Sequence, residues 1–175
     1  YLVDGMTLVI NTFFGWDFNS CELLHKQRTW YPIDFANPCP DSQVTSLHYH
    51  FPWLIKANIR WATFAAATGR KVKQLDWDSF FGAVEEGMTL RERIDALLPV
   101  ANRRYDTEAF EEFCAAHLAH LDEVTHEWFG TNDAKEAVRR KVAALFPPHE
   151  VESFTDLFFQ RIQQWRADEA AGVKP

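Results

Sequence analysis

Residues 18–43 read FNSCELLHKQRTWYPIDFANPCPDSQ, and the periodicity of the chain changes within this stretch. Two runs rich in apolar and aromatic residues, 18–24 and 30–35, flank the polar connector 25–29, a pattern that predicts an antiparallel hairpin. Prolines and acids follow, and from Asp41 onward the apolar residues recur at helical spacing. The stretch therefore marks the change from a strand-rich N-terminal part to a helical remainder.

The first residues predict another hairpin. Asp4-Gly5 separates YLV from MTLVINTFF, and Asp-Gly readily adopts the positive φ angles of tight hairpin turns. The two hairpins together predict an α+β fold, in which a small antiparallel sheet of about four strands precedes a mostly α-helical region. We expect the division between the two parts to separate residues 1–75 from residues 76–175.

Helix signals are frequent after residue 40. Asp41-Ser42 and Asp76 are candidate N-caps, and Gly69 is a candidate helix stop. Thr89 and Glu92 form a capping-box pattern. Further helices are expected at 108–129, as one long segment, and around 134–146 and 151–170.

Composition limits the classes of protein. Hydrophobic residues make up 47% and aromatic residues 15% of the 175 residues, enough for a core and for an interface, including one between copies of the chain. A net charge of −7 without a basic stripe argues against nucleic acid as a partner. The most apolar stretch, 47–67, contains charged residues and predicts a buried helix instead of a membrane span. Three widely spaced cysteines fit a reducing, cytoplasmic setting.

Oxygen-bearing side chains gather on the predicted hairpin at 18–35. Glu22 and Asp34 are twelve positions apart, and the short connector folds their strands back so that the two acids approach one another. Asn37 adds an amide just beyond. Carboxylate and amide oxygens are ligands that Mg²⁺ accepts together with phosphate oxygens. Acids, Asn and Pro are also ordinary turn residues, so the spacing by itself is a weak signal.

The words WDFNSCE (16–22) and IDFANPCPDSQ (33–43) resemble the C-terminal part of an ATP-grasp catalytic domain, in a bacterial, glutamate-ligase-like branch. In that family an acid on one strand and an E-x-N motif on the next hold the Mg²⁺ or Mn²⁺ ions that bridge the ATP phosphates. Glu22 matches the first acid and Asn37 the asparagine, but the second acid is Asp34, which gives D-x-x-N. Either a bulge re-aims Asp34, or the metal site is altered.

The resemblance covers roughly residues 1–70 and implies ATP-dependent ligation of a small carboxylate to an amine through an acyl phosphate. It implies that residues 1–75 are part of the catalytic lobe and that 76–175 are a helical extension. His48 and Lys56 are the candidate contacts to the nucleotide phosphates. The sequence equally fits a Lys56 whose aliphatic chain is buried in the helix packing and whose ammonium group reaches water. With no glycine-rich loop and no Lys or Arg before Glu22, the other ATP-binding parts are expected in a longer parent chain, and this chain alone is expected to be inactive.

Two other functions stay open. The aromatic-rich helices between residues 77 and 165 suit a non-catalytic protein-interaction module, because Trp and Tyr are favoured at interface centres. A helical metalloprotein is the third hypothesis. Its candidate ligands follow three-residue steps, and they are His117, His120, Glu123 and His126.

Overall fold

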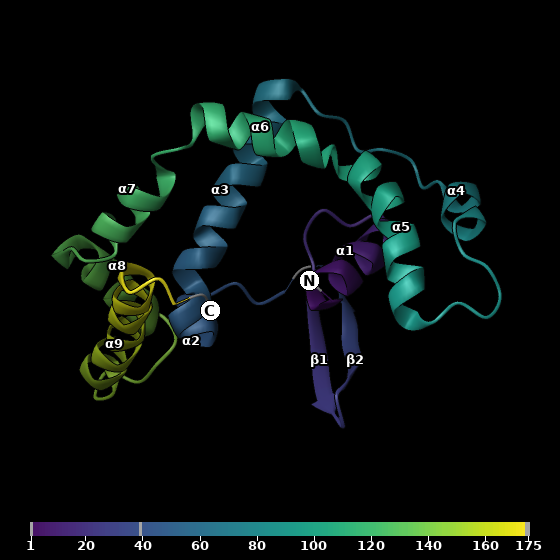
Figure 1. The fold of residues 1–175 in the computed structure, drawn as a ribbon. Coiled ribbons are helices and arrows are strands. Elements are labelled where there is room, and N and C mark those ends of the chain that lie inside the picture. The colour runs from purple at the N-terminus through teal and green to yellow at the C-terminus, as the bar shows by residue number, and fades with distance from the viewer. Residues whose placement is uncertain (1, 39, 174–175) are drawn as a thin grey trace. The chain divides into compact units, whose positions relative to one another are not determined.

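A computed structural model of the chain describes residues 2–38 and 40–173 (Figure 1). The described residues are mostly helical and contain one two-stranded antiparallel sheet. They form two compact units, each built from two separate stretches of chain. The first unit lies within 1–40 and 69–112, and the second within 41–68 and 113–175. No helix in these described ranges is long and apolar enough to cross a membrane.

Each unit has its own set of elements. The first unit holds helices α1, α4 and α5, both strands and the start of α6: α1 (Leu2–Phe14), β1 (Ser20–Lys26), β2 (Thr29–Asn37), α4 (Trp77–Gly82), α5 (Leu90–Tyr105), α6 (Thr107–His117). The second unit holds the end of α6 and the remaining helices: α2 (Val44–Leu47), the 3₁₀ helix η1 (His48–His50), α3 (Phe51–Thr68), α7 (Leu121–Trp128), α8 (Asn132–Ala143), α9 (Val151–Ala170).

The prediction of about four N-terminal strands is wrong, because residues 2–14 form helix α1 and not a hairpin at Asp4-Gly5. Gly5 is buried where α1 packs on α5, and a Cβ placed on it would lie 2.8 Å from Ile94 Cγ2. A glycine at this position therefore lets two helices approach closely instead of making a turn. The β-branched residues of this run mimic a strand, and a short apolar run leaves helix and strand ambiguous.

Helix α1 ends at a glycine. Gly15 has a φ of 74°, and the backbone N–H of Trp16 donates to the carbonyl of Asn11 over 3.0 Å. A residue in the left-handed region after the last helical turn is a common helix stop, and glycine adopts it without strain. The chain then turns through 15–19 and enters β1.

The second predicted hairpin is confirmed. Strands β1 and β2 pair antiparallel around a two-residue turn at Gln27 and Arg28, whose φ angles are 49° and 65°. Tight hairpin turns with two positive φ values match the twist of the flanking strands, and here two long polar residues adopt them in place of the usual Asn-Gly.

Most helix signals are confirmed. Asp76 accepts a hydrogen bond from the backbone of Ser79, and Thr89 with Glu92 forms a complete capping box at the start of α5. Gly69, with a φ of 62°, follows the end of α3. The expected single helix at 108–129 is instead two helices, α6 and α7, with a break at 118–120.

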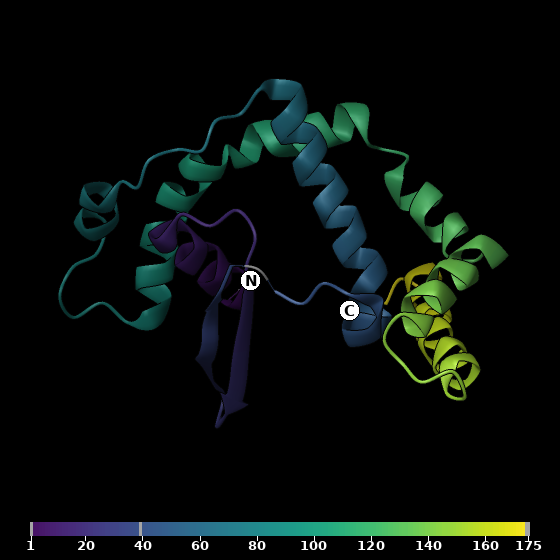
Figure 2. The same cartoon turned by 180° about the vertical axis from the view of Figure 1, so that it is seen from behind.

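The core of the second unit forms where α8 and α9 pack together and α9 meets η1 (Figures 1 and 2). Trp165, Ile162 and Val142 are among its most deeply buried side chains. The remaining buried members are Val44, Phe129, Ala134, Val138, Val151 and Phe158. In the first unit, α1 packs on α5, with Met6, Ile94, Leu97 and Ala101 buried.

The contact at Gly5 yields a stability prediction. Gly5→Val places a branched side chain against Ile94 and should lower the free energy of unfolding by about 1–3 kcal/mol, a typical cost of overpacking. Gly82→Val, in α4, is the matched control, because no atom lies within 4 Å of a Cβ placed there. Urea denaturation of both variants measures the difference. Equal losses of stability in the two variants would contradict the close approach of α1 and α5.

Candidate functional site

The hairpin register places Glu22 directly opposite Asp34, and Ser20 opposite Asn37. Between these two pairs β1 advances two residues while β2 advances three, so β2 carries one extra residue there. Residues two apart on a strand share a face, so Ser20 and Glu22 lie on one face of the hairpin. Their partners Asp34 and Asn37 therefore belong to that same face, and the β2 bulge brings the D-x-x-N residues together.

A second irregularity lies on the other side of the Glu22–Asp34 pair. Leu23 pairs with Pro32, so Ile33 is a second extra residue of β2. Glu22 and Asp34 are exposed, whereas Leu23 and Pro32 are half-buried. The irregular register at the two bulges therefore leaves both acids exposed, although the next pair, Leu23 and Pro32, is partly covered.

Asn19 replaces the hydrogen bonds that the bulge removes from the ladder. Its Nδ2 donates to Asn11 Oδ1 (2.8 Å) and to the Phe35 carbonyl (3.0 Å), and its Oδ1 accepts from the Asn37 N–H (2.8 Å). One side chain thus joins α1 to the irregular end of β2. This end of the hairpin carries Asp34 and Asn37, so Asn19 fixes the backbone that presents them.

We call the face that carries Ser20, Glu22, Asp34 and Asn37 the outer face of the hairpin. Its negative charge favours a cation. Two like charges directly opposite each other on a sheet repel, and neither Glu22 nor Asp34 has an ion-pair partner within the described residues. Asn37 contributes an amide and Ser20 a hydroxyl on the same face. This all-oxygen donor set fits a hard divalent cation such as Mg²⁺ or Mn²⁺, which completes its shell with water or phosphate oxygens.

Cys21 lies on β1 between the Ser20–Asn37 pair and the Glu22–Asp34 pair, close enough to Asp34 to sense its charge. Burial raises the pKa of its thiol, the Thr7 side chain lowers this pKa through a hydrogen bond, and the Asp34 carboxylate raises it through charge repulsion. The contact with Thr7 places Cys21 on the α1 side of the hairpin. The influence of Asp34 means that charge on the outer face reaches the thiol.

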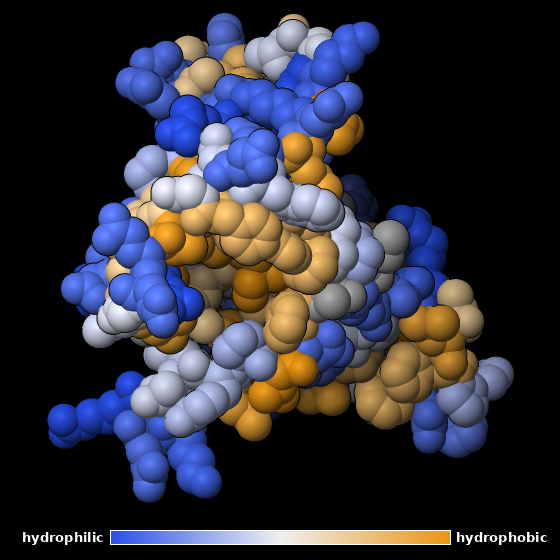
Figure 3. All heavy atoms as spheres, turned by 90° about the vertical axis from the view of Figure 1, so that its right-hand side faces the viewer, coloured by the Kyte–Doolittle hydropathy of each residue, from blue (hydrophilic) through white to orange (hydrophobic). Residues whose placement is uncertain are grey.

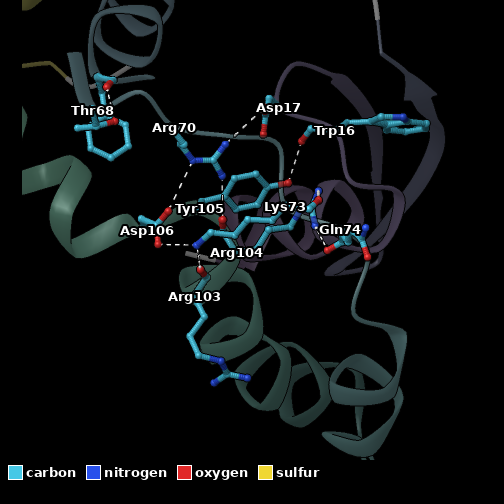
Figure 4. A network of polar contacts seen from close by, with 11 residues as sticks. Trp16, Asp17, Thr68, Arg70, Lys73, Gln74, Arg103, Arg104, Tyr105 and Asp106 are labelled. Atoms are coloured by element: carbon cyan, nitrogen blue, oxygen red, sulfur yellow. Dashed lines mark hydrogen bonds and ion pairs between the residues drawn. The ribbon is translucent and has the colours of Figure 1, made fainter. Parts of the chain in front are cut away.

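The loop that leads into β1 is held by the C-terminal end of α5 (Figure 4). The Tyr105 hydroxyl donates to the Trp16 carbonyl over 2.8 Å, and Arg70 lies 3.6 Å from an Asp17 carboxylate oxygen. Burial is the main cause that raises the pKa of Tyr105, which keeps its hydroxyl protonated as a donor.

Basic side chains of the first unit also donate hydrogen bonds to the carbonyls at the C-terminal end of α5. Arg70 donates to the Arg104 carbonyl (2.8 Å) and Lys73 to the Arg103 carbonyl (2.7 Å), while Lys73 also pairs with Asp106 at 2.5 Å (Figure 4). Cations next to the free carbonyls of a helix C-terminus are stabilising. This basic cluster therefore has a structural role in the first unit.

The two candidate phosphate contacts lie in the second unit, and each has partners there. The His48 ring stacks on Phe158 with centroids 4.7 Å apart, and its Nε2 lies 2.8 Å from the Thr45 carbonyl oxygen. Lys56 is buried, and its Nζ lies 2.7 Å from Glu169 and 3.2 Å from Asp122. These contacts give His48 and Lys56 structural partners in the second unit, and their contact with nucleotide phosphates stays a prediction.

The four residues of the metalloprotein hypothesis are divided by the break between α6 and α7. His117 packs on Phe113 at the end of α6, and His126 in α7 has its Nε2 3.1 Å from the Arg166 carbonyl oxygen. Over residues 2–38 and 40–173, no group of three or more His, Cys, Asp or Glu side chains is placed to hold a metal. The candidate ligands on the hairpin differ from such a group, because they are two carboxylates (Glu22 and Asp34), one amide (Asn37) and one hydroxyl (Ser20).

An apolar surface covers part of the first unit near α4. Figure 3 views the side that carries α4 and α5, where apolar side chains gather around a hollow bordered by hydrophilic ones. Trp77 and Phe81 are 51% and 60% exposed, and the Phe13 ring stacks on Trp77 with centroids 6.0 Å apart. Of the other tryptophans in the helical region, Trp128 is 44% exposed and Trp165 is buried.

Comparison with known proteins does not assign the chain to a family. The chain matches no protein-family model, and searches of curated proteins and of solved structures gave no significant match.

Two residues that build or support the candidate site were not among the sequence candidates. Ser20 is opposite Asn37, and Asn19 holds the bulge. The signal for Ser20 is present in the sequence, because S-x-E on one strand faces D-x-x-N on the other, and the unequal spacings require a bulge if all four residues share a face. Nothing local distinguishes Asn19, since its partner Asn11 belongs to a run that resembles a strand.

The Asn19 contacts give a second prediction. Asn19→Leu should lower the free energy of unfolding by about 1–3 kcal/mol, because it leaves the Phe35 carbonyl and the Asn37 N–H without their partner. Asn11→Ala removes only the Asn19–Asn11 hydrogen bond and should lose less. Urea denaturation checks both values, and the reverse order of the two variants would rule out this role of Asn19.

A third prediction tests the structural role of Lys56. Lys56→Met leaves the Glu169 and Asp122 carboxylates close together without their cation and should cost about 1–3 kcal/mol of stability, a value reduced because both acids are partly exposed. Arg60→Met, which removes the more exposed partner of Asp122, should cost less than about 1 kcal/mol. Thermal or urea unfolding distinguishes them, and a neutral Lys56→Met would contradict the assignment.

Proposed function

We propose that the outer face of the β1–β2 hairpin binds a divalent cation together with phosphate, as the metal-binding part of an ATP-grasp, carboxylate–amine ligase-like protein. The observation that carries the proposal is the register, in which the β2 bulge puts Glu22, Asp34 and Asn37 on one face. The D-x-x-N spacing has one residue more than the E-x-N motif, and the bulge takes up this extra residue. The acid and the amide can then lie on the same face, as the E-x-N motif would place them.

Each residue has a chemical role in this proposal. Glu22 and Asp34 supply the negative charge that attracts Mg²⁺ or Mn²⁺, and Asn37 supplies a neutral oxygen. A cation held by these residues would neutralise charge on the phosphates of ATP in the acyl-phosphate chemistry that the proposal implies. Asn19 keeps the backbone of the bulge in place, which limits movement of the two acids relative to each other.

The proposal assigns this chain one part of a ligase site. ATP, a small carboxylate and an amine are the proposed substrates, and the residues that bind adenine and the transferred phosphate are expected outside this sequence. The cytoplasmic setting indicated by the cysteine pattern suits such an enzyme and stays a prediction.

The fourth prediction is that the chain binds Mn²⁺ and that Glu22→Gln or Asp34→Asn each weakens this binding at least about tenfold, because each removes one of two acidic ligands. Electron paramagnetic resonance measures the loss of the free Mn²⁺ signal, with and without ATP. Glu86→Gln is the control, since Glu86 is an exposed acid outside the hairpin and should have no effect.

A second readout locates the cation on the hairpin. Mg²⁺ should screen Asp34 and so lower the pKa of Cys21, which makes the thiol react faster with an alkylating reagent near pH 8. Asp34→Asn should accelerate alkylation without Mg²⁺ and abolish the response to it. Mass spectrometry of the Cys21 peptide follows the rate. Absence of Mn²⁺ binding, or Mn²⁺ binding that Glu22→Gln and Asp34→Asn leave unchanged, would refute the proposed site.

A second candidate function is a protein-interaction module. The observation that favours it is the exposure of Trp77 and Phe81 on the apolar surface near α4. Substitutions of these two residues by Ser should disturb the association of the chain with a second copy, measured by sedimentation, and leave Mn²⁺ binding unchanged. The two functions therefore depend on separate surfaces of the first unit.

A further inference from the structure

The first unit contains a pocket of about 220 Å³ that is lined by residues of α1, α4, α5 and the segment 73–76. The apolar part of its lining includes Trp77, Phe80 and Val100. The charged part has three cations and one acid: Lys73, Arg103, Arg104 and Asp76. Because the pocket is smaller than the sites that hold drug-sized molecules, it suits a ligand with a single ring.

The aromatic side of the pocket is held in place by contacts with α1. The Trp77 indole N–H donates to the Phe13 carbonyl over 3.1 Å. The Phe13 ring stacks on Trp77 and meets the Phe80 ring edge-on, with centroids 5.3 Å apart in the second pair. A flat ring that enters the pocket therefore meets a preformed aromatic surface, on which stacked and edge-on contacts are favourable.

Two of the three cations have an acid nearby. Lys73 pairs with Asp106 at 2.5 Å. Asp76 accepts a hydrogen bond from the Ser79 N–H at the start of α4. Hydrogen bonds from Ser79 are the main causes that lower the pKa of Asp76, and the charge of Arg103 lowers this pKa further. Asp106 and Asp76 therefore offset the charges of Lys73 and Arg103.

Arg104 has no such acid. Its side chain is 9% exposed, and its two Nη atoms donate to the backbone carbonyls of Lys73 (3.0 Å) and Gln74 (3.1 Å) (Figure 4). Among the described residues, no carboxylate forms an ion pair with its guanidinium. Arginine stays protonated, and a buried charge without a counter-ion is costly. Its positive field reaches the pocket through space, without contact between Arg104 and a ligand.

Arg103 provides a guanidinium that a ligand can contact. Its side chain is exposed and lines the pocket next to Arg104 in sequence, and within the described part of the chain no carboxylate forms an ion pair with it. A guanidinium and a carboxylate are both planar and can join through two parallel hydrogen bonds. The charged side of the pocket therefore favours a carboxylate.

We propose that this pocket binds a small aromatic monocarboxylate, with its ring against Trp77, Phe80 and Val100 and its carboxylate on the side of Arg103 and Arg104. One negative charge matches the one buried cation that lacks a counter-ion. The flat ring matches the aromatic side of the pocket. This binding does not depend on the cation site proposed for the hairpin.

The test compares three probes that separate the ring from the charge. Benzoate and benzamide have the same shape and differ in charge, and acetate has the carboxylate without the ring. Titration of the ¹⁵N-labelled chain with benzoate at low ionic strength should shift the backbone amides of Gln74 and Arg103 and the indole N–H of Trp77. Benzoate should bind about tenfold more tightly than benzamide or acetate, because each of these lacks one half of the match.

Variants separate the pocket from the general charge of the chain. Arg103→Glu replaces an exposed cation by an anion and should weaken benzoate binding at least about tenfold, with little effect on benzamide. Arg93→Glu, at an exposed position on the same helix and outside the pocket lining, changes the net charge equally and should change neither affinity. Arg104→Met removes the buried charge and should weaken benzoate binding about fivefold or more.

Mn²⁺ binding should be the same in Arg103→Glu, Arg93→Glu and the wild-type chain, so a failure of this proposal is distinct from a failure of the hairpin site. Equal affinities of benzoate and benzamide would overturn the proposal, and so would acetate binding as tight as that of benzoate. Resonance shifts that avoid the pocket residues would also overturn it. Equal benzoate binding by Arg103→Glu and Arg93→Glu would do the same, and this comparison holds even if Arg104→Met does not fold.

Discussion

The first unit depends on the three hydrogen bonds of Asn19. A two-stranded hairpin is marginal by itself, and β2 carries two extra residues that interrupt its ladder with β1. Asn19 supplies the missing partners at one interruption and connects that end of the hairpin to Asn11 of α1. Helix α1 in turn packs closely on α5 through Gly5, so the irregular hairpin is supported by the most buried part of its unit.

The distribution of charge separates the structural groups from the candidate site. In the first unit Arg70 and Lys73 bind the last carbonyls of α5, and in the second unit Lys56 lies between Glu169 and Asp122. Glu22 and Asp34 differ from these acids, because no described cation pairs with either of them. Repulsion between two opposed carboxylates is tolerated on an exposed face and is relieved when a divalent cation binds there.

The second unit also carries an apolar pocket, lined by core residues that include Val44, Phe129 and Val138. Gln43 also lines this pocket, but its unpaired Oε1 exposes almost no surface and so is not reachable from the pocket. The hairpin face has charged and other oxygen-bearing side chains, whereas the pocket walls are mostly apolar and aromatic. The two surfaces therefore differ in chemistry, charged at the hairpin and apolar at the pocket.

The sequence by itself determined the features with local causes. The β1–β2 hairpin, the Asp76 cap, the Thr89 capping box and the glycine stop after α3 follow from residues that contact their own neighbours in the chain. It also indicated that Glu22 and Asp34 approach each other, whereas their direct opposition required the extra residue Ile33 in β2. Only the tertiary structure decided that residues 2–14 are helical, because Gly5 is explained by Ile94 on α5, about ninety positions away. The alignment of Asn37 with the two acids required the β2 bulge, and the loss of ladder bonds at that bulge is offset by Asn19 and by the packing of α1.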